Sequence, residues 1–199
     1  MRLRKLWKWS KRIFLWIFLA QLFYIILLKW VNPPITITQL SSWISGHGLK
    51  RDYVGRGSIS SDAKLAVIAS EDQLFPDHRG FDWKSIKKAM KYNEKKPGRI
   101  RGASTISQQV AKNVFLWQGR SWIRKGLEVY FTFMIELIWG KKRILEVYLN
   151  VIEMGEGVFG IEKAAEIYFN KPARALSRQE SAMIAACLPN PRRYKVKPV

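Results

Sequence analysis

Apolar residues dominate the N-terminal part of the chain. Between Ile13 and Leu28 no residue is charged and a single Gln interrupts the apolar run, and two more apolar residues follow Lys29. A bilayer-spanning helix needs about 20 predominantly apolar residues, so this pattern predicts a membrane anchor over residues 13–31. A cleaved signal peptide is the alternative, but the run is long for one and no small-x-small cleavage site follows it. We therefore expect the anchor to be retained.

After residue 60 the apolar positions recur with the spacing of amphipathic helices. Helix N-cap residues such as Asp82, Ser121 and Ser177 precede these predicted helices. Gly140 follows one of them, as is typical of a helix C-terminus. Strand patterns are almost absent. The fold class is therefore expected to be mostly α, with helices over about residues 61–71, 82–93, 104–115, 121–139, 141–149, 161–169 and 177–188.

Three stretches lack this helical pattern. Residues 32–60 mix short apolar runs with glycines, which suggests a connector with little fixed structure and one short helix near residues 40–44. The glycines between Gly155 and Gly160 suggest a loop, and Glu94–Arg101 suggests a mobile basic loop. We divide the chain accordingly into a basic cytoplasmic tail (1–12), an anchor (13–31), a juxtamembrane connector (32–60) and a catalytic domain (61–199).

Basic residues far outnumber acidic ones. The chain has 35 Lys and Arg against 15 Asp and Glu, a net charge of +20, and such a balance favours anionic partners. Six basic residues and no acidic one lie in the first twelve positions, so the positive-inside rule places the N-terminus in the cytoplasm. The chain after Pro34 is then expected outside the cytoplasm. This argues against nucleic acid as a partner and leaves anionic lipid or a lipid-linked phosphate.

Two polar segments carry the candidate chemistry. Glu71–Asp82 concentrates carboxylates, a histidine and aromatic residues around a predicted helix end. Gly102–Gln109 is a Gly/Ser/Thr/Gln turn of the kind that presents amides and hydroxyls to an anion. A carboxylate that can act as a base, beside a polar cradle and many cations, points to a substrate with an anionic leaving group.

These two segments resemble the leading motifs of the peptidoglycan glycosyltransferases, family 51. Arg124–Glu128 is similar to the family's R-K-x-x-E motif, and Lys142–Asn150 is similar to its K-x-x-I-L-E-x-Y-L-N motif. The four motifs occur in the family's order, and the similarity extends from about Leu65 to Tyr194. Ala103 departs from the pattern, because many members have a second Gly there. The resemblance implies a lysozyme-like, two-lobed helical domain preceded by a single transmembrane helix, as in the monofunctional members.

The resemblance also implies an activity and a location. Members polymerise lipid II into linear peptidoglycan strands by inverting glycosyl transfer, with release of polyprenyl pyrophosphate. The expected partners are lipid II, the growing glycan chain and membrane lipid, with cell-wall synthesis proteins as further candidates. The expected place is the bacterial cytoplasmic (inner) membrane, as a single-pass protein with its catalytic domain on the periplasmic or external side.

By the same resemblance, two glutamates match the family's catalytic positions. Glu71 is the expected base. Glu128 is expected to orient Arg124 or Lys125, or to help hold a divalent cation (Mg or Mn) at the pyrophosphate. An ordinary ion pair along one helix face is the structural alternative for Glu128. The sequence contains no Cys/His cluster that would form a metal cage, and we expect no organic cofactor.

The remaining candidate site residues fall into three groups. Basic side chains can clamp a pyrophosphate, neutral side chains can bind phosphate or sugar, and a third group would shape the cleft around Glu71. Thr105 could instead be a helix N-cap, and His78 could be a hydrogen-bonding scaffold. The basic residues could instead belong to a solvated surface. The basic group is Lys112, Arg120, Arg124 and Lys125. The neutral group is Ser104, Thr105, Gln108, Gln109 and Asn113. The third group is Asp72, Phe75 and His78.

Two other functions remain open from the residues. A lysozyme-like lytic transglycosylase would also use one glutamate, but it needs an acid that protonates a sugar oxygen and no cation cluster for a pyrophosphate. A membrane-anchored protein without enzymatic activity, binding lipid or wall polymer by charge, would explain the net charge but not the motifs.

Overall fold

Helices make up most of the structure, a computed structural model that describes residues 2–96, 98, 102–119 and 121–197. The prediction of a mostly α fold with an apolar N-terminal helix is confirmed. The three short strands form one small sheet. The helices are α1 (Arg2–Leu27), α2 (Ile37–Ile44), α3 (Ser61–Glu71), α4 (Trp83–Lys95), α5 (Ile106–Phe115), α6 (Trp122–Ile138), α7 (Lys141–Val151), α8 (Ile161–Phe169) and α9 (Arg178–Cys187), with short 3-10 turns η1 (Arg56–Ser58) and η2 (Ala173–Ala175).

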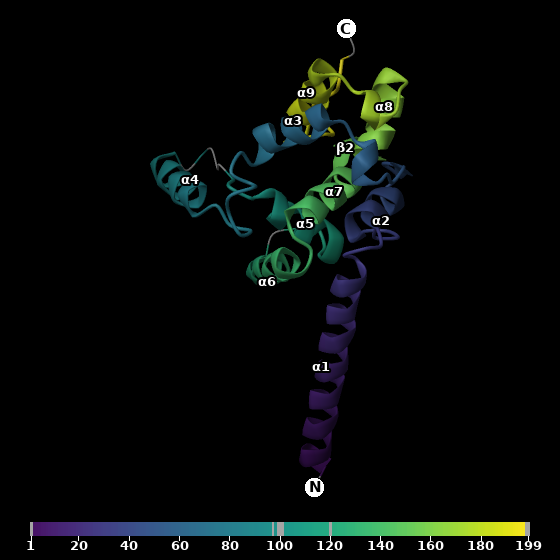
Figure 1. The fold of residues 1–199 in the computed structure, drawn as a ribbon. Coiled ribbons are helices and arrows are strands. Elements are labelled where there is room, and N and C mark those ends of the chain that lie inside the picture. Colours follow the sequence, from purple (N-terminus) through teal and green to yellow (C-terminus); the bar gives the residue numbers. More distant parts are fainter. Residues whose placement is uncertain (1, 97, 99–101, 120, 198–199) are drawn as a thin grey trace.

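Helix α1 extends from the body of the molecule as a straight rod (Figure 1). It begins in the basic tail and ends at Leu27, a few residues before the expected end of the anchor at residue 31. Its segment Arg4–Leu27 is long and apolar enough to cross a membrane, and very little of that segment is buried within the protein. These properties are compatible with a single-pass anchor.

The C-terminal end of α1 is built into the folded body. Ile25 and Leu28 are fully buried in the core. The indole nitrogen of Trp139 donates to the carbonyl of Ile25 at 2.8 Å, and the Arg143 guanidinium donates to the carbonyls of Leu28 and Val31. The last carbonyls of a helix lack partners within it; here Trp139 satisfies that of Ile25, and Arg143 binds the turn that follows α1. The apolar helix is therefore joined to the domain by packing and hydrogen bonds as well as by the chain.

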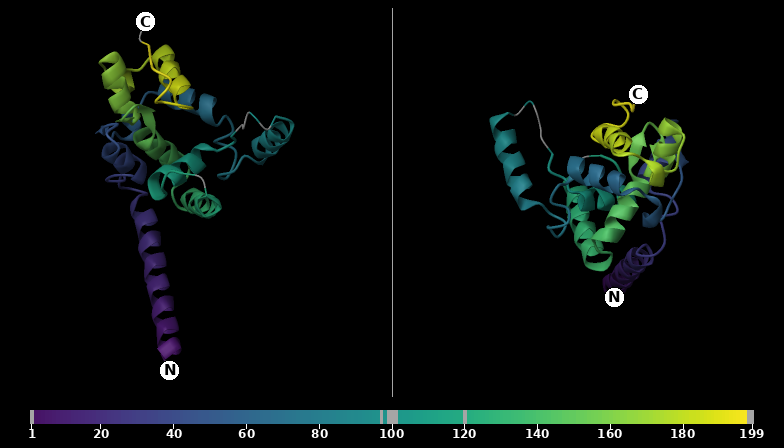
Figure 2. Two further views of the ribbon diagram at one scale, coloured as in Figure 1. Left: turned by 180° about the vertical axis from the view of Figure 1, so that it is seen from behind. Right: turned by 45° about the horizontal axis from the view of Figure 1, so that its top comes forward.

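Helix α7 lies at the centre of the body and contacts α5, α6 and α8 (Figure 1). Its residues Ile144, Val147, Tyr148 and Val151 recur at helical spacing and are almost completely buried. Helix α3 packs against α9 on one side of this core. Helix α4 projects from the body, as two views show (Figures 1 and 2).

The glycine-rich segment predicted to be a loop contains a β-hairpin. Strands β2 (Glu153–Gly155) and β3 (Val158–Phe159) pair antiparallel, and β1 (Lys50–Arg51) pairs parallel to β3. Gly157 has a φ of +68°, and a Cβ there would lie 2.1 Å from the carbonyl oxygen of His47. Only glycine fits this close approach of the hairpin turn to the chain before β1.

The segment 32–60 has more structure than expected. Thr36 and Gln39 form a capping box at the start of α2, and both are buried. Asn150 of α7 accepts a hydrogen bond from the Val54 amide and donates to the Val54 carbonyl, both at 2.9 Å. The capping box of α2 and the Asn150 hydrogen bonds thus give this segment a fixed structure and attach it to the core.

This attachment predicts the effect of Asn150→Ala. The substitution leaves the Val54 amide and carbonyl without their partner, so the free energy of unfolding should fall by about 1–3 kcal/mol. Thermal and denaturant unfolding followed by circular dichroism would measure the change. Asn170→Gly is the control, because Asn170 has a φ of 53° that glycine adopts freely. Equal stability of the Asn150→Ala variant and the wild type would contradict the prediction.

Candidate active site

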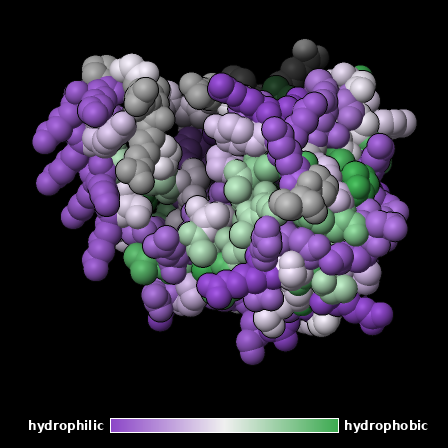
Figure 3. Space-filling model, turned by 90° about the horizontal axis from the view of Figure 1, so that it is seen from above, coloured by the Kyte–Doolittle hydropathy of each residue, from purple (hydrophilic) through white to green (hydrophobic). Residues whose placement is uncertain are grey.

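A cavity of about 1330 Å³ opens between α4 and the body of the protein. Seen from the end opposite α1, the arm that contains α4 is strongly hydrophilic and is separated from the body by a hollow (Figure 3). The walls come from α2, α3, α4, α5 and the segment after α9. The predicted site residues that line the cavity are Glu71, Asp72, Ser104, Thr105, Gln109, Lys112 and Asn113.

Glu71 is the last residue of α3, and its carboxylate lies at the cavity wall. Ser60 caps the start of this helix by accepting from the Ala63 amide, and buried Ala63 and Val67 hold the helix against the core. The side-chain amide of Gln109 on α5 donates to Glu71 Oε2 at 2.7 Å. The candidate base is therefore partly exposed to the cleft and oriented by a neutral donor.

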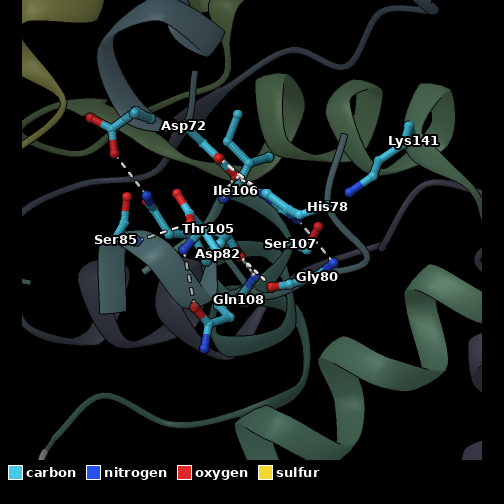
Figure 4. Close-up of polar contacts among 12 residues, drawn as sticks. Asp72, His78, Gly80, Asp82, Ser85, Thr105, Ile106, Ser107, Gln108 and Lys141 are labelled. Atoms are coloured by element: carbon cyan, nitrogen blue, oxygen red, sulfur yellow. Dashed lines mark hydrogen bonds and ion pairs between the residues drawn. The ribbon is translucent and has the colours of Figure 1, made fainter. Parts of the chain in front are cut away.

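Asp72 follows Glu71 and is buried, and its carboxylate points toward His78 and the start of α5 (Figure 4). Its Oδ2 accepts from the backbone amide of Ile106 and from Nε2 of His78, both at 2.9 Å. Nδ1 of His78 accepts from the Gly80 amide at 3.1 Å, so the ring proton lies on Nε2. Asp72 and His78 thus join the end of α3 to the start of α5.

Phe75 belongs to the same buried support and does not line the cavity. Its ring lies edge-on to His78, with centroids 6.2 Å apart, and the Lys141 ammonium lies over its face at 4.4 Å. Lys141 also binds Glu136, which accepts from Ser107 on α5. This packing fixes the loop between α3 and α4 from behind.

Thr105 and Gln108 form the N-terminal cap of α5 (Figure 4). Each side-chain oxygen accepts from the other residue's backbone amide, and the Thr105 hydroxyl donates to the Gly80 carbonyl at 2.7 Å. These contacts make Thr105 the N-cap of α5, which is the alternative that sequence analysis gave for it. Ser104, one residue earlier, is exposed at the cavity and makes none of these capping contacts.

The basic residues of α6 surround a buried glutamate. Glu128 is only 3% exposed, and it accepts from Arg124 Nη1 at 2.8 Å and from Lys125. The two pairs have the i,i+4 and i,i+3 spacing of one helix face. Nε of Arg124 is buried without a hydrogen-bond partner among the described residues. These three residues do not line the cavity, but they lie behind Lys112, which does.

Lys112 on α5 is the basic residue of this group that lines the cavity. Burial lowers the pKa of its ammonium group, and the positive charges of Arg124 and Lys125 lower it further. The negative charges of Glu128 and Glu71 oppose this shift. Because burial disfavours the charged form of Lys112, an anion bound in the cleft would stabilise its ammonium group. Arg120, the fourth predicted clamp residue, lies outside the described residues.

Glu128 does not fit the role of a metal ligand. Both of its oxygens already bind cations, one to Arg124 and the other to Lys125. No group of three or more His, Cys, Asp or Glu side chains that could hold a metal ion occurs within the part of the chain that the structure describes.

Thr38 and Gln118 are among the cavity-lining residues that sequence analysis missed. Thr38 on α2 donates to Asn113 Oδ1 at 3.0 Å, and Gln118 donates to the Thr38 hydroxyl at 2.6 Å. Asn113 lines the cavity with them. Thr38 lies in the segment interpreted as a connector, and Gln118 belongs to no motif. Only the contact across the fold shows that they belong to the site.

A partly exposed carboxylate and a half-buried cation in one large cleft are features of a group-transfer enzyme that acts on an anionic substrate. Residues 37–198 match the family model described as Transglycosylase, and the chain belongs to this family. This match and the relatives confirm the family that the sequence motifs predicted.

Those relatives are named biosynthetic peptidoglycan transglycosylases. The proteins of Shigella boydii serotype 4 and Escherichia coli (strain ATCC 8739) are each 59% identical over 161 residues, which cover 79% of this chain and 66% of the relative. The Yersinia pseudotuberculosis serotype O:3 protein is 51% identical over 201 residues, 98% of this chain and 83% of the relative. The chain thus spans just under two thirds of the first two relatives.

The buried contacts of Asp72 predict the effect of Asp72→Asn. The new amide would point a donor at the Nε2 proton of His78, so the free energy of unfolding should fall by about 1–3 kcal/mol. Asp82→Asn is the matched control, because Asp82 accepts from the Ser85 amide as the N-cap of α4, and Asn caps equally well. Thermal unfolding of both variants would measure the difference. Equal melting temperatures would show that the Asp72 contacts do not stabilise the fold.

Proposed function

We propose that this protein polymerises lipid II into linear glycan strands, with inversion at the transferred sugar and release of polyprenyl pyrophosphate. The observation that carries the proposal is the presence of Glu71 and Lys112 in one cleft. They supply a base and a positive charge, which are the two requirements of this reaction. The cavity exceeds the about 300–1,000 Å³ of common small-molecule pockets, as a site for two sugar-lipids must.

Glu71 would act on the incoming sugar. Its carboxylate takes the proton from the acceptor 4-hydroxyl as the hydroxyl oxygen bonds to the anomeric carbon. The bond between that carbon and the pyrophosphate oxygen breaks, and its electron pair leaves with the pyrophosphate. Attack opposite the leaving group inverts the anomeric carbon. Gln109 holds the carboxylate in place through the 2.7 Å hydrogen bond.

Lys112 would act on the leaving group. The departing pyrophosphate gains negative charge, and a fixed cation at the cleft stabilises this charge as it develops. Arg124 and Lys125 add positive charge behind Lys112, and Glu128 holds both of them in place. The pyrophosphate in turn favours the protonated form of Lys112, opposing the effect of burial.

The proposal includes a membrane location. Helix α6 lies at the base of the body, next to the point where α1 leaves it (Figure 1). Several of its large apolar side chains are exposed, and lipid is the partner that best fits such a surface beside an anchor. We propose that these side chains contact the bacterial inner membrane, with the N-terminus cytoplasmic. They are Trp122 (92% exposed), Ile123 (75%), Leu137 (70%) and Phe133 (58%).

The central test uses purified lipid II and the detergent-solubilised protein, with products separated on a gel. The wild type should form polymer, and Glu71→Gln should reduce the rate by at least about 100-fold, because removal of a general base costs 10²–10⁴ in rate. Glu166→Gln is the matched control, since Glu166 pairs with Lys163 on the exposed surface of α8.

Each other outcome of this test has a definite meaning. Polymer from both the wild type and Glu71→Gln would keep the function but remove Glu71 as the base. No polymer from the wild type, together with cleavage of pre-formed glycan, would replace the proposal with the lytic transglycosylase.

The α6 surface generates a separate prediction. The double variant Ile123→Ser/Phe133→Ser should lower polymerisation of lipid II in vesicles severalfold, because each change removes apolar area from the lipid contact. Activity in detergent should change little, since neither residue lines the cavity. Ile167→Ser, an exposed position on α8, is the control. Equal activity of the double variant in vesicles would contradict the membrane contact.

A further inference from the structure

A line of three side chains leads from the core to the candidate base. Tyr148 lies on the central helix α7, and its hydroxyl donates to Oε1 of Gln109 at 3.3 Å. The other end of the same amide, Nε2 of Gln109, donates to Glu71 Oε2 at 2.7 Å. The line thus connects α7, α5 and α3, and its last member faces the cleft.

Tyr148 is placed to act as a permanent donor. Its side chain is fully buried, and Gln109 is its one hydrogen-bond partner among the described residues. Burial, together with the negative charges of Glu71 and Asp72, raises the pKa of the Tyr148 hydroxyl well above its ordinary value. The hydroxyl therefore keeps its proton and continues to donate.

Tyr148 and Glu71 together set the orientation of the Gln109 amide. The oxygen and nitrogen ends of a glutamine amide have nearly the same shape, so the neighbours determine the orientation. The carboxylate of Glu71 only accepts and therefore takes the NH₂ end, and the Tyr148 hydroxyl stabilises this orientation by donating to the oxygen end. The reversed amide would place its oxygen against the carboxylate and repel it.

We propose that Tyr148 is a positioning residue that holds Glu71 in its working geometry by fixing the orientation of the Gln109 amide. The inference rests on the proposed function, because it assigns Tyr148 a part in the step that uses Glu71 as base. Tyr148 does not line the cavity, so it acts without touching the substrate. Its loss should therefore change the rate of the chemical step and not the binding of lipid II.

The test measures kcat and KM for lipid II polymerisation by Tyr148→Phe, which removes the hydroxyl and keeps the ring. The hydrogen bond is long and neutral, so kcat should fall about threefold to tenfold, with KM unchanged. Tyr168→Phe is the matched control, because Tyr168 is a partly buried tyrosine of α8 whose hydroxyl donates to the Met154 carbonyl at 3.4 Å. It should leave kcat unchanged.

A double-mutant cycle separates positioning from a general effect on packing. Gln109→Met removes the amide and keeps the volume, and on this background Tyr148→Phe should lower kcat less than twofold, because the connecting group is gone. Independent effects that multiply would overturn the inference. So would a rise in KM with kcat unchanged.

The outcomes also distinguish this inference from the proposed function. A wild type that forms no polymer overturns both. An active wild type whose Tyr148→Phe variant keeps its full kcat overturns the positioning role alone.

Discussion

The site depends on one buried carboxylate. Asp72 connects the end of α3 to the first turn of α5 through the Ile106 amide, and it holds His78, which in turn fixes Gly80. Buried carboxylates need such partners because an unpaired buried charge is strongly unfavourable. As a result, Glu71 and the α5 residues that face the cleft keep one relative geometry.

The charges of the site follow a similar logic. Arg124 and Lys125 would repel each other and Lys112 if they stood alone, and Glu128 between them offsets much of that repulsion. Of these three cations, Lys112 is the one that lines the cleft. This cluster has an excess of positive charge and is held in place before a substrate arrives. A fixed cluster stabilises a departing anionic group better than flexible surface lysines would.

The apolar helix is also part of this arrangement. Trp139 and Arg143 bind the last carbonyls of α1, and the same region of the chain continues into α7, whose Tyr148 supports the cleft. The direction of α1 and the direction of the cleft are therefore coupled through packed helices. An enzyme that takes its substrate from a bilayer benefits from such a fixed relation between anchor and site.

The sequence by itself determined the order of the helices, the apolar N-terminal segment, the family and several of the residues around the cleft, Glu71 and Lys112 among them. These features depend on local periodicity and on motifs such as Arg124–Glu128, in which the interacting residues are neighbours on one helix. Local spacing could also predict that Thr105 caps α5, although it could not choose between a cap and a substrate contact.

Only the tertiary structure decided which polar residues face the substrate and which support the site from behind. Thr38 meets Asn113 across 75 positions of the chain, and Tyr148 meets Gln109 across 39. The structure also showed that the Asp72 carboxylate is held by His78 and the Ile106 amide, whereas its neighbour Glu71 accepts from Gln109 at the cavity. These differences arise from the packing of distant helices, and no periodicity within a short segment reports where such segments meet.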